Sequence, residues 1–327
     1  AHIKLNAAGA ALVASDTFTL NANRGMTLGN WGYLGVASGE ALTYNGVIAG
    51  AYNLVKNQAG ELILGGNNTF GGSAYVDAGT LTLNHASAGG AGGIYLGMES
   101  GSDAATLNLG SAITVANNLT VRDGSSGIKY FKAADTATLS GTLAISETTE
   151  NLLNVDVASG ETLTMSGVIS GTGGGEITKT GAGTLVMSNT GNTHDKKVTV
   201  TAGTLQMANS RNLGADPAGA YADKLTLDGG TLAATASFTM HANNSTTLGA
   251  SHGTIDVAAS QTLTYPAAIS GSGNLTKTGS GTLTLSGDNP YTGNTTVSAG
   301  TVIVDNWCDE SAFTVSSGAT LMGDSAV

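Results

Sequence analysis

The residues with the most potential for chemistry are the acids, the histidines and the single cysteine. Glycosidases need two carboxylates a fixed distance apart, and calcium-dependent lyases need clustered acids. The densest acidic group is Asp305, Asp309 and Glu310 around Cys308. This group could bind calcium or a carbohydrate, but we prefer to interpret it as an ordinary acidic surface loop.

His194 and Asp195 are adjacent and resemble a general base with its partner. Adjacent residues of an extended chain point to opposite faces, and no matching nucleophile is evident, so we predict a solvated turn. The remaining histidines lack metal-ligand spacing and are expected to be exposed polar residues; they are His2, His85, His241 and His252. We predict no catalytic residue, no cofactor-binding residue, no metal ligand and no cofactor.

Composition excludes several classes of protein. The 327 residues include 49 glycines and 11% charged residues, and the net charge of -11 repels nucleic acid and anionic membrane surfaces. We therefore expect no nucleic-acid partner and no membrane insertion by this segment. The uncharged run Gly229 to Ile255 is rich in Thr and is predicted to form strands and turns. A single cysteine, Cys308, excludes an internal disulfide framework, and we interpret it as a partly buried thiol.

Three stretches of the chain align with one another. Each contains a run such as ASGETLTMSGVISG, then KTGAGTL, then TAGTL, and the equivalent glycines are Gly50, Gly171 and Gly271. The similarity extends upstream, where Phe18, Leu28 and Ile48 match Phe238, Leu248 and Ile269. We predict one continuous solenoid over residues 1–327, built from diverged cassettes at about 1–84, 94–209 and 223–306, with a partial repeat at 307–327.

Each cassette consists of short alternating segments. Examples are Thr184 to Met187, Thr282 to Leu285 and Thr80 to Leu83, in which Leu alternates with β-branched Thr. An antiparallel sandwich or propeller would pair neighbouring strands through hairpins, whereas a solenoid stacks like residues in ladders. Because equivalent positions keep the same residue type, we predict an all-β parallel solenoid, essentially without helix, with roughly 20 to 25 residues in each turn.

Asparagine recurs at one turn of each cassette, at Asn68, Asn192 and Asn289. Stacked asparagine side chains can tie adjacent layers of strands together. We therefore expect asparagine ladders at this turn.

The segments KTGAGTL (Lys179 to Leu185) and KTGSGTLTLSGDNPYTGNTTVSAGT (Lys277 to Thr301) resemble the passenger-associated repeat of bacterial autotransporters. Pro290 stands where the family pattern usually has Thr. The resemblance implies a right-handed parallel β-helix, export through the outer membrane, and a role at the cell surface or in the medium. We expect the chain to be a passenger segment, a cleaved product or one window of a longer protein.

The two ends of the sequence resemble internal parts of the repeat. Ile3, Leu5 and Leu12 match Leu225, Leu227 and Leu232, and GATLMGDSAV resembles SRNLGADPAG. We expect that the ends are cut from a longer solenoid or meet head to tail in a fibre, because a heterologous contact generates an open filament.

These observations favour an extracellular structural or adhesive scaffold without enzymatic activity. The expected partners are further copies of the chain and a surface or glycan ligand. The alternative is a carbohydrate-active β-helix, either a lyase or a hydrolase, which would need a groove lined with acids and aromatic residues. Aromatic residues make up only 5% of the sequence and are not expected to cluster. A third hypothesis is an adhesin that binds a defined host or surface ligand.

Overall fold

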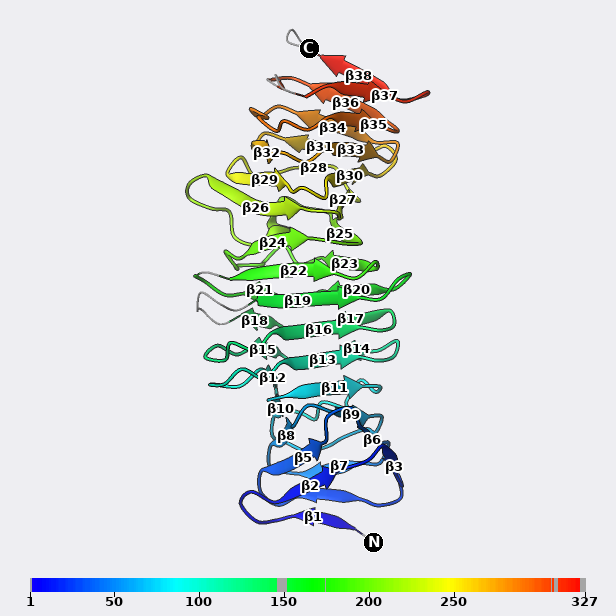
Figure 1. Ribbon diagram of the computed structural model, residues 1–327, viewed down its shortest axis with the longest axis vertical. Coiled ribbons are helices and arrows are strands. Elements are labelled where there is room, and N and C mark those ends of the chain that lie inside the picture. The colour runs from blue at the N-terminus through cyan, green and yellow to red at the C-terminus, as the bar shows by residue number, and fades with distance from the viewer. Residues whose placement is uncertain (1, 146–151, 174, 307, 309–310, 324–327) are drawn as a thin grey trace. The chain divides into compact units, whose positions relative to one another are not determined.

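The computed structural model describes residues 2–145, 152–173, 175–306, 308 and 311–323. The chain forms two compact units, Ala1–Gly175 and Glu176–Val327. Within each unit, short strands lie one above another, and every described strand pair is parallel (Figure 1). The predicted all-β parallel solenoid is confirmed, and the alternative of an antiparallel sandwich or propeller is excluded.

The first unit has four sets of stacked strands. The first set is β1 (Ile3–Leu5), β4 (Met26–Leu28) and β7 (Ile48–Gly50). The second is β2 (Ala11–Ala14), β5 (Gly32–Val36), β8 (Leu54–Asn57), β10 (Ala74–Val76), β12 (Ile94–Leu96), β15 (Leu119–Val121), β18 (Leu143–Ile145) and β21 (Ile169–Ser170). The third, which we call the β9 sheet, is β3 (Phe18–Leu20), β6 (Ala41–Tyr44), β9 (Glu61–Leu64), β11 (Gly79–Leu83), β13 (Ala105–Leu109), β16 (Lys129–Ala133) and β19 (Leu152–Val157). The fourth is β14 (Thr114–Val115), β17 (Ala137–Leu139) and β20 (Thr162–Met165).

The second unit has three such sets. They are β22 (Glu176–Thr180), β24 (Lys197–Val200), β26 (Tyr221–Leu227), β29 (Asn244–Leu248) and β32 (Ile269–Gly271); β23 (Thr184–Met187), β25 (Thr204–Met207), β27 (Thr231–Ala234), β30 (Gly253–Val257), β33 (Leu275–Thr278), β35 (Thr295–Val297) and β37 (Phe313–Val315); and β28 (Phe238–Thr239), β31 (Thr262–Tyr265), β34 (Thr282–Leu285), β36 (Thr301–Val304) and β38 (Thr320–Gly323). One short 3-10 helix, η1 (Ser210–Leu213), is the only helix among the described residues.

The core of each unit is a set of apolar ladders. In the β9 sheet, residues of successive strands pair in register and are fully buried; they are Leu42, Leu62, Leu81, Leu107, Phe131 and Val155. The threonines that alternate with them face outward, as in β23 and β34. The predicted placement of Leu inside and Thr outside is therefore confirmed. Alternation with period two produces this pattern because successive side chains of a strand point to opposite faces.

The length of a turn varies along the chain. Leu54 pairs with Ala74, 20 residues later, whereas Thr80 pairs with Thr106, 26 residues later. Most additional residues of the longer turns lie in connections between strands, because the strands stay in register except for an irregularity between Tyr221 and Leu225 of β26. The run Gly229 to Ile255 contains β27, β28, β29 and the first residues of β30, as the sequence predicts.

The three equivalent glycines sit where the chain leaves a strand with positive φ. Gly50, Gly171 and Gly271 have φ of 116°, 138° and 104°. A Cβ on any of them would lie 2.2 Å from a backbone oxygen of the turn before; those oxygens belong to Leu28, Ile145 and Leu248. Only glycine fits, because it lacks the Cβ and populates positive φ without strain. The alignment of Leu28 with Leu248 is thereby confirmed in space, since each faces the equivalent glycine.

Candidate functional site

Three lysines occupy inward positions of the strands in the repeated segments. Lys56, Lys179 and Lys277 are fully buried. Lys56 pairs in register with Leu34 of the preceding turn and Val76 of the following turn, so it takes a place in an apolar ladder. Burying an ammonium group is costly unless hydrogen-bond acceptors replace its water.

Backbone carbonyl groups supply those acceptors. The Nζ of Lys56 donates to the carbonyl oxygens of Asn57, Gln58 and Ala78 at 2.9, 2.8 and 3.0 Å. Two acceptors belong to the residues that follow the lysine, and the third lies one turn later. The same pattern recurs at Lys179, with Thr180, Gly181 and Ala202, and at Lys277, with Thr278, Gly279 and Ala299. We call these three arrangements the lysine cages.

Burial in the cages disfavours the charged form of Lys56 and Lys277 and so lowers their pKa. Burial lowers the pKa of Lys56 to about 8, an effect that Glu61 partly opposes, and burial also lowers the pKa of Lys277. Three carbonyl oxygens replace water as hydrogen-bond acceptors for each ammonium group, at the corner between two strands. The arrangement ties consecutive turns together, so we assign it a structural role.

Buried asparagines tie the turns together at a second corner. Asn68, Asn192 and Asn289 are 4%, 0% and 1% exposed. The Oδ1 of Asn68 accepts from the backbone N–H of Ile48 at 2.8 Å, and its Nδ2 donates to the carbonyl of Ala88 at 2.8 Å. One side chain thus bridges three turns. In these contacts the bonds run to the backbone rather than between stacked amides, which differs from the expected asparagine ladder.

A shallow groove of about 360 Å³ lies on the outer face of the β9 sheet. Charged and polar side chains from successive strands line it, with three alanines: Glu61, Thr80, Thr106, Asn108, Lys132, Ala133, Ala134, Asp156 and Ala158. These residues come together because outward positions of in-register strands form rows. The sequence did not single out this groove, although its polar residues alternate with buried, mostly apolar residues along each strand.

Hydrogen bonds and an ion pair order the side chains of the groove. Asn108 Nδ2 donates to Thr82 Oγ1 at 3.2 Å, and Thr82 Oγ1 donates to a carboxylate oxygen of Glu61. At the other end, Lys132 Nζ lies 3.3 Å from an oxygen of Asp156. The Lys132 ammonium also lies 5.1 Å from the centre of the Tyr130 ring. The groove therefore presents donors and acceptors that are already oriented.

Aromatic side chains cluster on the first unit, and the expectation that they do not cluster is wrong. Trp31 stacks on Tyr75 with ring centres 5.3 Å apart, and Tyr75 stacks on Tyr95 at 4.8 Å. Tyr75 and Tyr95 are register partners in β10 and β12. Composition could not reveal this stack, because the three residues are far apart in sequence and only the length of the turns superimposes them.

Charged groups surround the central tyrosine of the stack. The guanidinium carbon of Arg122 lies 5.4 Å from the centre of the Tyr75 ring. Arg122 also forms ion pairs with Glu99 at 2.6 Å and Asp77 at 3.5 Å. Burial raises the pKa of Asp77, and the Arg122 charge opposes that rise. One guanidinium thus joins two carboxylates and an aromatic ring from neighbouring turns.

The comparisons with known proteins agree with this geometry. The family model described as passenger-associated-transport-repeat matches residues 54–83, 177–207 and 275–304. Each matched segment contains four strands from two consecutive turns, in which the first strand pairs with the third and the second with the fourth. The three segments thus resemble passenger-associated transport repeats. Every one of them contains a lysine cage.

A curated relative extends the similarity beyond the repeats. The chain is 34% identical over 266 residues to a protein named "Adhesin BmaC autotransporter" from Brucella suis biovar 1 (strain 1330). The match covers 80% of this chain but only 7% of the relative. No solved structure matches the chain. The resemblance to autotransporter passengers is confirmed, and the chain is a passenger-like parallel β-solenoid.

The prediction of a solvated turn at His194 is wrong. In the middle transport repeat, His194 and Lys196 are fully buried, whereas Asp195 and Lys197 are half-buried. Burial alternates from residue to residue, as expected for an extended chain. The segment is nevertheless not solvated, because His194 and Lys196 point into the interior. Lys224 Nζ donates to the carbonyl of Lys196 at 2.8 Å. Burial, with the charges of Lys224 and Lys196, lowers the pKa of His194 to about 3.

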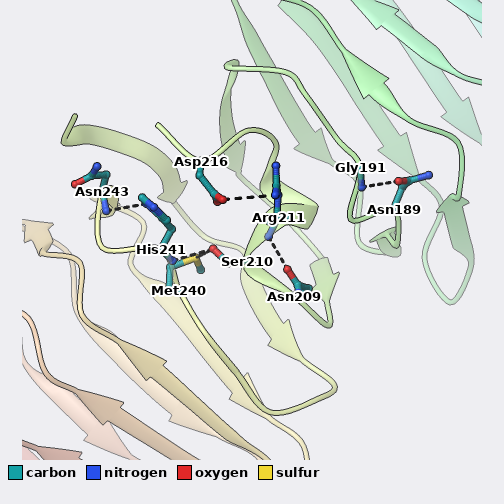
Figure 2. A network of polar contacts seen from close by, with 9 residues as sticks. All are labelled: Asn189, Gly191, Asn209, Ser210, Arg211, Asp216, Met240, His241 and Asn243. Atoms are coloured by element: carbon teal, nitrogen blue, oxygen red, sulfur yellow. Dashed lines mark hydrogen bonds and ion pairs between the residues drawn. The ribbon is translucent and has the colours of Figure 1, made fainter. Parts of the chain in front are cut away.

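A polar network surrounds η1, just after the middle repeat (Figure 2). The Oδ1 of Asn209 accepts from the backbone N–H of Arg211 at 2.9 Å and caps the helix. Arg211 Nε lies 3.7 Å from Asp216 Oδ2. Ser210 Oγ accepts from the backbone N–H of His241 at 2.8 Å, so the contact between this serine and histidine does not involve the imidazole ring. The network fixes a loop and does not resemble a nucleophile with its base.

The other residues considered for chemistry lie apart. His2 and His252 are exposed, as expected, while His85 and His241 are half-buried. Cys308 is 9% exposed, which confirms a partly buried thiol. Asp305 is exposed, but Trp307, Asp309 and Glu310 lie outside the described residues, so the acidic group around Cys308 stays a prediction. Among the described residues, no three His, Cys, Asp or Glu side chains are placed to hold a metal ion. No helix in the described part of the chain is long and apolar enough to span a membrane.

Proposed function

We propose that this chain is an adhesive scaffold, a passenger segment exposed at the bacterial surface or released from it. The observation that carries the proposal is the similarity to an autotransporter named an adhesin, which extends over 80% of this chain. The chain spans about 7% of that relative's length, so the activity of the whole protein is part of the proposal. Ladders of buried residues, lysine cages and bridging asparagines support a durable scaffold that presents its outward side chains.

Adhesion by the purified chain tests this proposal. Beads coated with the chain would be counted on epithelial cell monolayers and on immobilised glycans, with albumin-coated beads as the control. Circular dichroism would first establish that the chain is folded. We expect several-fold more attachment than with albumin on at least one surface. Equal attachment on every surface would contradict an adhesive role.

The geometry of the groove supports a role without catalysis. Glycosidases place two carboxyl groups about 5 to 9.5 Å apart. Glu61 and Asp156 belong to strands four steps apart in the β9 sheet, which separates them by about 19 Å. Asp156 is also paired with Lys132. A screen for release of reducing ends or unsaturated products from polysaccharides is expected to be negative, and product formation at a rate proportional to protein would favour the lyase or hydrolase alternative.

Association of several copies is a further part of the proposal. Parallel β-solenoids expose strand edges that can pair with another copy unless they are covered. Electron microscopy of concentrated protein would distinguish isolated particles from filaments. Filaments would support head-to-tail association, and a particle that stays monomeric at high concentration would contradict it.

A further inference from the structure

The groove on the β9 sheet is a site whose side chains fit one class of ligand. Its walls carry both hydrogen-bond donors and acceptors: the Glu61 and Asp156 carboxylates, the Asn108 amide, the Lys132 ammonium and the hydroxyls of Thr80 and Thr106. A sugar hydroxyl both donates and accepts, so a polyhydroxylated ligand can use each of these groups. The volume of about 360 Å³ is in the range of small-ligand sites.

The floor of the groove suits the apolar faces of pyranose rings. Ala134 is exposed and Ala158 is half-buried, and both contribute methyl groups beside the polar side chains. Tyr130 is the register partner of Thr106 and so adds an aromatic ring to the same outward row. Small apolar residues between polar ones let a ring lie flat, with its hydroxyls directed toward the walls.

The spacing of the strands selects a linear ligand. The groove residues repeat along the stack in steps of about 4.8 Å, a distance similar to the length of one sugar unit in an extended chain. From Glu61 in β9 to Asp156 in β19 there are four such steps. An oligosaccharide of about four units that runs along the stack would meet at least one polar side chain on each strand that it crosses.

Other ligand classes fit less well. An extended peptide binds by pairing with a free strand edge, but β11, β13 and β16 are paired on both sides. Two carboxylates against one ammonium group disfavour an anionic ligand, and the net charge of -11 adds to that repulsion. The separation of Glu61 and Asp156 prevents them from binding one metal ion together.

We propose that this groove binds an uncharged linear oligosaccharide, with successive sugar units placed on successive turns of the first unit. The proposal deepens the adhesive function and rests on it for its biological meaning. The groove would supply the contact between the scaffold and a glycan-bearing surface. Asn108 and Lys132, register partners on the adjacent strands β13 and β16, would make the decisive hydrogen bonds.

Isothermal titration calorimetry with defined tetrasaccharides tests the site. The panel would contain cellotetraose, chitotetraose and mannotetraose, with tetragalacturonate as the anionic comparison. We expect at least one neutral member to bind the full chain with a micromolar to millimolar Kd and tetragalacturonate to bind at least tenfold more weakly. The proposal would be overturned if no neutral tetrasaccharide bound, or if the anionic one bound most tightly.

Variants locate the binding. Asn108→Ala combined with Lys132→Ala is expected to weaken binding at least tenfold, because each lost hydrogen bond costs roughly three- to tenfold. Lys197→Ala is the matched control, since Lys197 forms a comparable ion pair with Asp223 at 3.0 Å on an outward face. Ala134→Leu fills the groove at an exposed position and should also weaken binding without affecting folding. Unchanged affinity in both groove variants would overturn the assignment.

The adhesion assay separates this inference from the proposed function. If coated beads attach equally well with the wild-type chain and with Ala134→Leu, and added tetrasaccharide does not compete, the groove inference fails while the adhesive function stands. If the chain binds a tetrasaccharide in the groove but its beads attach to no surface, the site stands and the adhesive function fails.

Discussion

Buried lysines take positions that apolar side chains fill in neighbouring turns. Alternation alone places Lys277 on the same side of β33 as Leu275, so its inward direction could be predicted from the sequence. The complete burial of Lys277 could not be predicted, because it depends on three carbonyl oxygens that converge only when two turns are stacked. The same limit applies to His194, whose burial depends on the path of the loop in three dimensions.

The first prediction concerns the lysine cage of the third repeat. Lys277→Met removes the donor and leaves three carbonyl groups without it, so we expect the free energy of unfolding to fall by about 1–3 kcal/mol. Urea denaturation would measure the change. The matched control is Lys197→Met, which removes a partly exposed ion pair and should cost about 0–1 kcal/mol. A Lys277→Met variant as stable as the wild type would contradict the stabilising role of the cage.

The second prediction concerns pH. His194 has a pKa of about 3 in the folded chain, against about 6.5 when unfolded. Between these values the unfolded chain binds the additional proton, so stability is complete above pH 6.5 and falls as the pH decreases toward 3. At pH 5 the loss is about 2 kcal/mol.

Stability measured between pH 7 and pH 4 tests this account. His194→Gln should flatten the dependence, whereas His252→Gln, at an exposed position, should retain it. Equal pH slopes for the two variants would show that His194 does not cause the loss.

At the scale of elements, the positions of short strands could be predicted well. Thr184 to Met187 and Thr282 to Leu285 form β23 and β34 with the expected bounds, because alternation and flanking glycines define each strand locally. The groove and the aromatic stack could not be predicted. Trp31, Tyr75 and Tyr95 meet because of turn lengths, and the spacing between register partners varies from 18 residues (Thr295 to Phe313) to 27 (Val198 to Leu225).

The third prediction concerns the corner glycines. A Cβ at Gly271 would lie 2.2 Å from the carbonyl oxygen of Leu248, at a φ of 104°. We expect Gly271→Ala to lower the free energy of unfolding by about 2–4 kcal/mol, from backbone displacement and positive φ together. Gly318→Ala is the control, because Gly318 also has positive φ but meets nothing within 4 Å, so only about 1–2 kcal/mol should be lost. Urea midpoints equal for the two variants would argue against a steric role for this corner.

For the chain as a whole, the repeats indicate the fold, and the adhesin relative suggests the function. The family resemblance is confirmed by three repeats, and an adhesin relative matches most of the chain. The division into three cassettes and the association of copies stay predictions. The adhesive function depends on outward side chains, and the repeat pattern does not determine which residues these are. A ligand class could therefore be inferred only from the groove, where the structure brings outward side chains together.

Each transport repeat folds as two parallel turns held by a buried lysine. An experimental structure of the chain at side-chain resolution tests it most directly. The account predicts parallel in-register strands in all three repeats, with Nζ of Lys56, Lys179 and Lys277 within hydrogen-bonding distance of three carbonyl oxygens each. Antiparallel neighbours, or these three lysines directed into solvent, would contradict it.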